Sequence, residues 1–143
     1  MPTLNAAISA SASALAAERL RIEVAVSNLA NAESTRGPDG QPYRRRDVVL
    51  RSSPVEVFDA ALGRATATGV EVAGVVVDDA PAARRYQPSH PDADAEGYVA
   101  LPNVDPAEEM VDMLGASRAY QANLAAVNLI RDLVQRALEL GRG

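Results

Sequence analysis

The residues that could carry acid–base chemistry lie in one polar stretch, "HPDADAEG", which runs from His90 to Gly97. His90 is the one histidine of the chain and stands two positions before Asp92, and an imidazole beside a carboxylate can act as a general base. No convincing serine nucleophile or oxyanion-forming loop accompanies this pair. A hydrolase centred on His90 and Asp92 is therefore a minor alternative, and we expect His90 to be a loop residue that contacts another subunit.

The same stretch resembles the start of a calcium-binding loop, with carboxylates at Asp92, Asp94 and Glu96 followed by Gly97. The twelfth position of such a loop should be a bidentate glutamate, but here it is Asn103, and the acidic segment "DPAEE" begins too late. We therefore expect no metal, no cofactor and no small-molecule substrate.

Three consecutive arginines follow Tyr43 and could bind phosphate, namely Arg44, Arg45 and Arg46. No glycine-rich phosphate cradle follows them. The chain has 14 basic and 19 acidic side chains, a net charge of −5, which argues against a nucleic-acid partner. We expect all four residues to contact other subunits, the arginines through salt bridges to acidic neighbours.

Composition restricts the possible functions further. The 143 residues suit one domain, and the absence of cysteine excludes disulfides, zinc–thiolate sites and thiol catalysis. Aromatic residues make up 3% of the chain, so its stability must come from long helices or from neighbours. No segment is long and apolar enough to span a membrane. Because Arg19 is the first basic residue and serines and alanines replace an apolar run, we expect no cleavable signal peptide.

Residues 4–30 predict a helix, with alanines that would let another helix approach closely. Positions three and four apart form a heptad-like seam with two polar interruptions. The seam consists of Leu4, Ile8, Ser11, Leu15, Glu18, Ile22, Ala25 and Leu29.

A second helix begins at "DPAEE", where Asp105 suits the N-cap, Pro106 the first helical position and Glu108 the capping-box position. Gly141 would end it, about 50 Å further on at about 1.5 Å per residue. A periodic pattern of this length indicates a coiled coil or similar assembly. Its stripe consists of Met110, Met113, Ser117, Tyr120, Leu124, Val127, Ile130, Val134 and Leu138.

The middle of the chain has turn formers and valine-rich stretches instead. We expect short strands at 43–50, 55–58, 69–79 and 97–102 in a small antiparallel sheet, with a surface excursion over 78–97. The fold class is α+β, with the terminal helices paired antiparallel as a coiled-coil-like stalk and the middle part at one end. The expected regions are 1–34, 35–104 and 105–143.

Four stretches carry a resemblance to the bacterial flagellar basal-body rod proteins, closest to a proximal-rod member: "SNLANAEST", "GPDGQPYRRR", "HPDADAEGYVALPNV" and "EEMVDMLGASRAYQANLAAVNLI…ALELG". Glu33 and Ser34 depart from the asparagine and threonine usual there. The resemblance implies a non-enzymatic axial subunit, exported through the flagellar type III apparatus without signal cleavage. Its terminal helices would pack with copies of itself and other rod proteins into a tube within the periplasm. A coiled-coil adaptor of the secretion machinery is the alternative.

In such an assembly, we expect amide side chains within the apolar seam to determine how the helices are aligned. Unpaired buried amides are costly, so paired ones favour one register of packing over others. The alternative interpretation is that these side chains face water or cap a helix end. The amides concerned are Asn28, Asn31, Gln121, Asn123 and Asn128.

Overall fold

The computed structural model describes residues 2–54 and 68–141, with side chains from Leu4 onward. Its elements follow the order α1 (Pro2–Asn31), β1 (Arg46–Pro54), β2 (Thr68–Val77), β3 (Ala83–Tyr86), β4 (Tyr98–Leu101) and α2 (Pro106–Leu140). This order confirms the α+β fold, with long N- and C-terminal helices and antiparallel strands between them.

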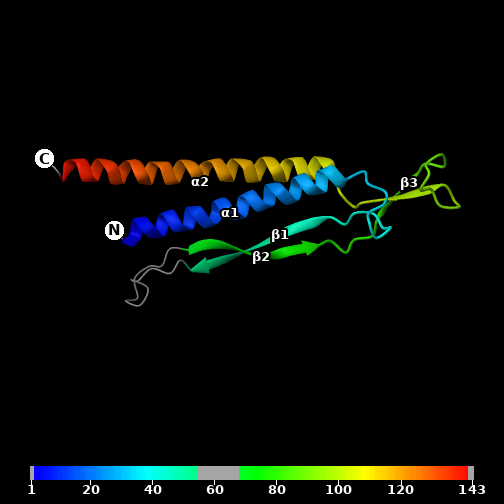
Figure 1. Ribbon diagram of the computed structural model, residues 1–143, viewed down its shortest axis with the longest axis horizontal. Coiled ribbons are helices and arrows are strands. Elements are labelled where there is room, and N and C mark those ends of the chain that lie inside the picture. The colour runs from blue at the N-terminus through cyan, green and yellow to red at the C-terminus, as the bar shows by residue number, and fades with distance from the viewer. Residues whose placement is uncertain (1, 55–67, 142–143) are drawn as a thin grey trace.

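The two helices lie side by side and antiparallel, and the end of α2 extends beyond the start of α1 (Figure 1). The expected N-cap of α2 is confirmed, because the Asp105 carboxylate accepts a hydrogen bond of 2.8 Å from the Ala107 N–H. At the other end, the Gly141 N–H donates to the Ala137 carbonyl oxygen at 3.2 Å. Neither helix, within the described part of the chain, has an apolar stretch that could cross a bilayer.

The buried apolar positions of the helix pair are occupied by alanine. Ala6, Ala17 and Ala25 on α1 and Ala116 on α2 are buried, and their size allows close packing. The larger residues expected in the α1 seam are half-buried: Leu4, Ile8, Leu15, Ile22 and Leu29.

The described strands form two separate two-stranded antiparallel sheets instead of one. In the first, β1 pairs with β2 from Arg46 opposite Val77 to Pro54 opposite Thr68, with an irregularity after Val49. In the second, β3 pairs with β4, and β3 lies within the stretch that the sequence suggested was a surface excursion. The strand expected at 55–58 lies outside the described residues.

The β1–β2 hairpin runs back along α1, so that α1 lies between α2 and the hairpin (Figure 1). Ser13 of α1 contacts the hairpin directly, because its hydroxyl accepts a hydrogen bond of 3.0 Å from the Val70 N–H of β2. The same hydroxyl donates to the Ala10 carbonyl oxygen of α1 at 2.8 Å. The expectation that the whole middle part sits at one end of the stalk is therefore wrong. Of the described strands, β3 and β4 lie at that end, whereas β1 and β2 run alongside α1 (Figure 1). A lone hairpin is marginally stable, so it gains by burying one face on α1.

Candidate functional site

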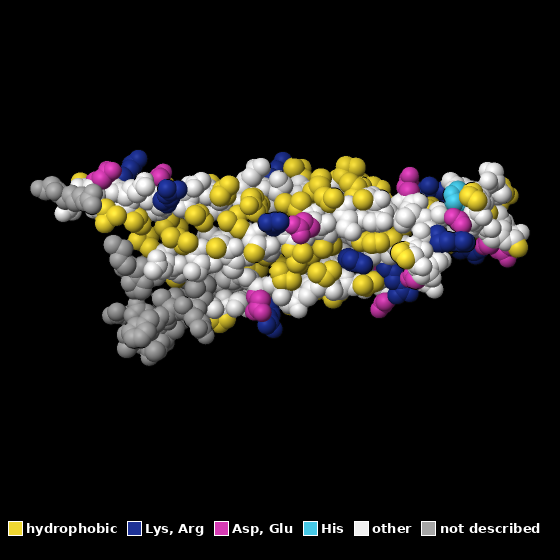
Figure 2. Space-filling model, in the orientation of Figure 1, with side chains coloured by type: hydrophobic (Ala, Val, Ile, Leu, Met, Phe, Trp, Pro, Cys, Tyr) yellow, Lys and Arg dark blue, Asp and Glu magenta, His cyan; other side chains and the backbone are white. Residues whose placement is uncertain are grey.

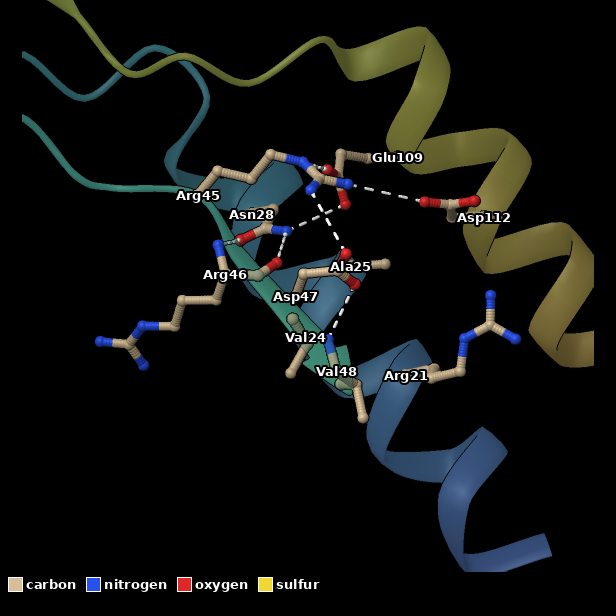
Figure 3. A pocket seen from close by; sticks show the side chains of 10 residues that line it. All are labelled: Arg21, Val24, Ala25, Asn28, Arg45, Arg46, Asp47, Val48, Glu109 and Asp112. Carbon is tan, nitrogen blue, oxygen red and sulfur yellow. Dashed lines mark hydrogen bonds and ion pairs between the residues drawn. The ribbon is translucent and has the colours of Figure 1, made fainter. Parts of the chain in front are cut away.

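A buried asparagine joins three parts of the fold. The Asn28 side chain is 1% exposed, and its amide nitrogen donates to the Arg46 carbonyl oxygen at 2.8 Å and to Glu109 Oε2 at 3.0 Å (Figure 3). Its amide oxygen accepts from the Arg46 N–H at 3.0 Å and from the Tyr43 hydroxyl at 2.9 Å. All four hydrogen-bonding positions of the amide are used, so Asn28 links α1 to the start of β1 and to α2.

Glu109 is 2% exposed, and its carboxylate accepts hydrogen bonds from an arginine guanidinium as well as from the Asn28 amide. Arg45 Nε donates to Glu109 Oε1 at 2.6 Å, and the same guanidinium lies 3.6 Å from Asp112 and 3.8 Å from Asp47 (Figure 3). Burial lowers the pKa of Arg45, but the hydrogen bond to Glu109 and the nearby carboxylates outweigh this effect, and the pKa is raised. The buried charge is thus paired and hydrogen-bonded, as a low-dielectric site requires.

Local turn chemistry delivers the start of β1 to this position. After α1 ends at Asn31, the Gly37 N–H donates to the Gln41 carbonyl oxygen at 2.7 Å, and Gly40 has a φ of 78°. That left-handed conformation suits glycine and allows the chain to reverse. The following residues therefore return alongside the last turn of α1, next to Asn28.

The other half-buried amides of the expected set bond within their own helices. Asn31 donates to the Ser27 carbonyl oxygen at 2.8 Å, and Asn123 donates to the Ala119 carbonyl oxygen at 2.9 Å. Neither bond reaches a second element of the fold, so neither determines the alignment of the helix pair.

The remaining two amides, Gln121 and Asn128, are exposed on α2. The hydrogen bond between Asn28 and Glu109 shows that Asn28 on α1 and Glu109 on α2 lie at the same level along the antiparallel helix pair. Gln121 follows Glu109 by a distance of about 18 Å along the helix, at about 1.5 Å per residue. The amides of α1 and α2 therefore lie at different levels within one chain, and a register role for those on α2 remains a prediction.

The structure divides the expected stripe of α2. Met113, Tyr120, Val127, Ile130 and Val134 are half-buried, whereas Met110, Leu124 and Leu138 are exposed in the single chain. Sequence reasoning missed Glu109 as part of the site. A usable signal exists, because Glu109 stands four positions before Met113, on the same side of the helix, and an acid on a buried side needs a cationic partner.

The arginines and tyrosine expected to contact other subunits all have partners within the chain. Arg44 Nη1 lies 3.3 Å from Asp79 Oδ1 on the surface, and the Arg46 guanidinium lies 5.6 Å from the centre of the Tyr43 ring. Arg45 belongs to the buried junction. Their contacts with other subunits remain a prediction.

The polar groups of the candidate hydrolase site at His90 and Asp92, and of the candidate calcium loop that follows it, form hydrogen bonds and ion pairs that stabilise loops. His90 Nδ1 accepts a hydrogen bond of 3.1 Å from the backbone N–H of Asp92. The Asp92 carboxylate contacts the Thr35 hydroxyl at 2.8 Å and Arg36 Nη2 at 3.1 Å. The side-chain pair that a hydrolase would need is thus not formed.

Asp94 organises the loop between β3 and β4. One carboxylate oxygen accepts from the N–H groups of Tyr98 at 2.8 Å and Glu96 at 3.0 Å, and the other accepts from Arg84 at 2.6 Å. The Tyr98 N–H, with smaller contributions from Arg84 and the Glu96 N–H, lowers the pKa of Asp94 despite some loss of hydration. Among the described residues, no cluster of three or more potential metal ligands occurs.

Two family descriptions match the chain. Residues 8–38 match the family described as "Flagella basal body rod protein", which covers most of α1 and the turn after it. Residues 95–140 match "Flagellar basal body rod FlgEFG protein C-terminal", which covers β4 and all of α2.

Curated relatives match almost the whole chain. The flagellar basal-body rod protein FlgC of Salmonella typhimurium is 50% identical over 130 residues, which cover 91% of this chain and 92% of the relative. FlgC of Bacillus subtilis is 43% identical over 94% of this chain and 96% of its own length. FlgC of Borreliella burgdorferi is 38% identical over 98% and 99%, respectively. With such identity over nearly the full length of each relative, the chain belongs to the FlgC family of flagellar basal-body rod proteins.

Proposed function

We propose that this chain is a structural subunit of the flagellar basal-body rod. In this role it packs its helix pair against copies of itself and other rod proteins to form a helical tube that is part of the motor drive shaft. The termini, 1–34 and 105–143, form the inner tube region, and residues 35–104 provide the β-rich part around it. The subunit acts mechanically and has no catalytic role. A secretion adaptor and a hydrolase are not favoured, because full-length relatives are named as rod proteins.

One observation carries this proposal: α2 presents large apolar side chains on the side away from α1. Val111, Leu114, Leu129 and Leu133 are each more than half exposed, with Val111 at 69%. Helical spacing places Val111, Leu114 and Leu129 opposite Ala116, which is buried, and Leu133 lies next to Leu129 one turn further along. Apolar side chains also cover much of the visible face of the molecule (Figure 2). Monomeric proteins seldom leave such continuous apolar surface in water, and neighbouring helices in a tube would cover it.

Several expected assembly residues fit the same role. Met110, Leu124 and Leu138 are exposed in one chain and would be covered by adjacent helices. Gln121 and Asn128 would then find partners on other subunits, where paired amides favour a single packing register.

We also propose delivery by the flagellar type III export apparatus into the periplasm, with α1 retained. Ala6 is buried within the first turns of α1, and α1 contacts both α2 and the β1–β2 hairpin. If α1 were cleaved off as part of a signal peptide, the surfaces of α2 and of the β1–β2 hairpin that pack against it would be exposed to water.

The experiment replaces two apolar residues that are already exposed. Leu129→Glu combined with Leu133→Glu should leave the free subunit folded, because both side chains face water in the single chain. In the rod, each charge would be buried without a partner at a cost of several kcal/mol. We expect the double variant to be expressed but absent from purified basal bodies, and the cells to be non-motile.

Gln135→Glu provides the matched control, because it introduces the same side chain at an exposed position of the same helix. Basal bodies of this variant should contain the subunit at the wild-type level. Normal incorporation of the double variant would contradict packing through the outer side of α2.

A further inference from the structure

An open pocket with a cavity volume of about 610 Å³ lies between the end of α1, the turn over residues 36–42 and the start of β1. Three arginines line it, Arg36, Arg44 and Arg46, together with a single carboxylate from Asp39. Arginines therefore outnumber carboxylates in its lining, and two of the arginines, Arg36 and Arg44, are paired with carboxylates outside it. We call it the arginine pocket.

The guanidinium groups of this pocket are available to a second partner. Arg36 pairs with the half-buried Asp92 at 3.1 Å, and Arg44 pairs with the exposed Asp79 at 3.3 Å. The Arg44 pair is fully on the surface and therefore weak. Arg46 stacks on the Tyr43 ring and makes no ion pair within the described part of the chain. The exposed Asp39 carboxylate accepts a hydrogen bond from the Gln41 N–H at 3.2 Å, which orients it toward the backbone of the turn.

The wall of the pocket is held in shape before any ligand arrives. Pro38 and Pro42 restrict the backbone of the turn, and the hydrogen bond from the Gly37 N–H to the Gln41 carbonyl oxygen closes it. Tyr43 is fixed through its hydroxyl bond to Asn28. A preformed site loses little entropy on binding, and guanidinium groups suit carboxylates because they can donate two parallel hydrogen bonds.

We propose that the arginine pocket receives carboxylate side chains of an adjacent copy of this chain. This inference rests on the proposed rod function. The exposed side of α2 supplies suitable groups, since Glu108, Asp132 and Glu139 form no ion pair among the described residues. A pocket on one copy and an acidic surface on the next make a head-to-tail contact, which propagates into a ring or a helical filament.

The experiment introduces a photo-crosslinking residue into the arginine pocket of the full-length chain. The variant is expressed in motile cells, from which basal bodies are then purified. Gln41 is exposed and lines the pocket, so it is replaced by the photoreactive residue benzoylphenylalanine. After irradiation of purified basal bodies, we expect a product of roughly twice the chain mass of 15.0 kDa. Mass spectrometry should identify the attached peptide as a segment of α2 that contains an exposed carboxylate.

A charge-neutral variant tests whether the arginines cause this contact. Arg46→Gln should lower the crosslink yield roughly tenfold, as expected for the loss of charge-assisted hydrogen bonds. The change leaves the Asn28 junction in place, because Asn28 contacts backbone atoms of Arg46. Arg51→Gln is the matched control: it lies on β1, pairs with Glu71 at 3.1 Å and is not part of the pocket. Its yield should equal that of the parent.

The outcomes separate this proposal from the rod function. If the subunit is present in basal bodies but crosslinks to a different protein, to a glycan or to nothing, the proposal is overturned and the rod function stands. An Arg46→Gln yield equal to that of the parent also overturns it. Absence of the parent subunit from basal bodies would overturn the rod function itself.

Discussion

At the residue scale, the contact between Asn28 and Glu109 connects positions 81 residues apart and lies fully within the protein. The asparagine finds four partners only when α1, α2 and the start of β1 are aligned in one way. A slip of one helical turn, about 5.4 Å, would leave buried donors and acceptors without partners. We therefore interpret this junction as a device that selects one alignment of the helix pair.

Replacing the asparagine should show its contribution. Asn28→Leu removes all four hydrogen bonds. Glu109 Oε2 and the backbone N–H and carbonyl of Arg46 then lose the partner that Asn28 provided, so the free energy of unfolding should fall by about 2–4 kcal/mol. The measurement is urea denaturation followed by circular dichroism. Asn123→Leu is the control, because Asn123 bonds only to Ala119 of its own helix, and it should change stability by less than about 1 kcal/mol. Equal effects of the two variants would contradict the junction.

At the element scale, the β3–β4 hairpin has two strands of four residues each, too short to be stable through strand pairing alone. Turn chemistry supports it instead. Gly97 has a φ of 83°, and a Cβ there would lie 2.9 Å from Tyr86 Cε2, so glycine is required. The Tyr86 and Tyr98 rings pack edge to face at 5.3 Å, and Asp94 closes the turn.

The pKa of Asp94 makes this hairpin sensitive to acid. The folded pKa lies below the ordinary aspartate value of 3.8, chiefly because of the Tyr98 N–H. The stabilisation is therefore fully present above the unfolded pKa and is lost as the pH falls through the folded pKa. We expect the Tyr98 amide proton to shift in NMR spectra only below about pH 4. Asp94→Asn should abolish this transition, and its persistence in that variant would assign it to another group.

At the scale of the whole molecule, the described chain buries few apolar groups and exposes many. Its buried apolar residues are Ala6, Ala17, Ala25, Val99, Leu101 and Ala116, and among its largest fully buried side chains are the polar Glu109 and Asn28. Much of the apolar surface of α2 remains in water until neighbours cover it. Long helices without such cover gain little from packing, so we expect their order to depend on assembly.

Hydrogen exchange on a verified monomer measures this dependence along α2. Amides at 109–116, next to the buried junction and Ala116, should be more protected than those at 129–140, where exposed leucines lack cover. In assembled rods the difference should shrink, because neighbouring helices cover the outer end. Strong and equal protection along α2 in the monomer would contradict the idea.

The sequence by itself determined both helices and, among the described strands, all except β3. The start of α2 followed from Asp105 and Pro106, because capping depends on residues adjacent in the chain. Helical periodicity predicted both long helices, and valine-rich stretches predicted β1, β2 and β4. Four motifs, spread over both ends and the middle of the chain, were enough to indicate the family.

Only the tertiary structure decided which surfaces meet. Apolar residues occur on several sides of α2, so spacing predicted only part of the inward side and also included Leu124 and Leu138, which are exposed. Nor could it show that the β1–β2 hairpin covers α1, or that Asn28 bonds to a β-strand backbone and an acidic residue of the other helix. These choices depend on contacts between residues far apart in the chain, whereas local propensities and periodicities report on neighbours alone.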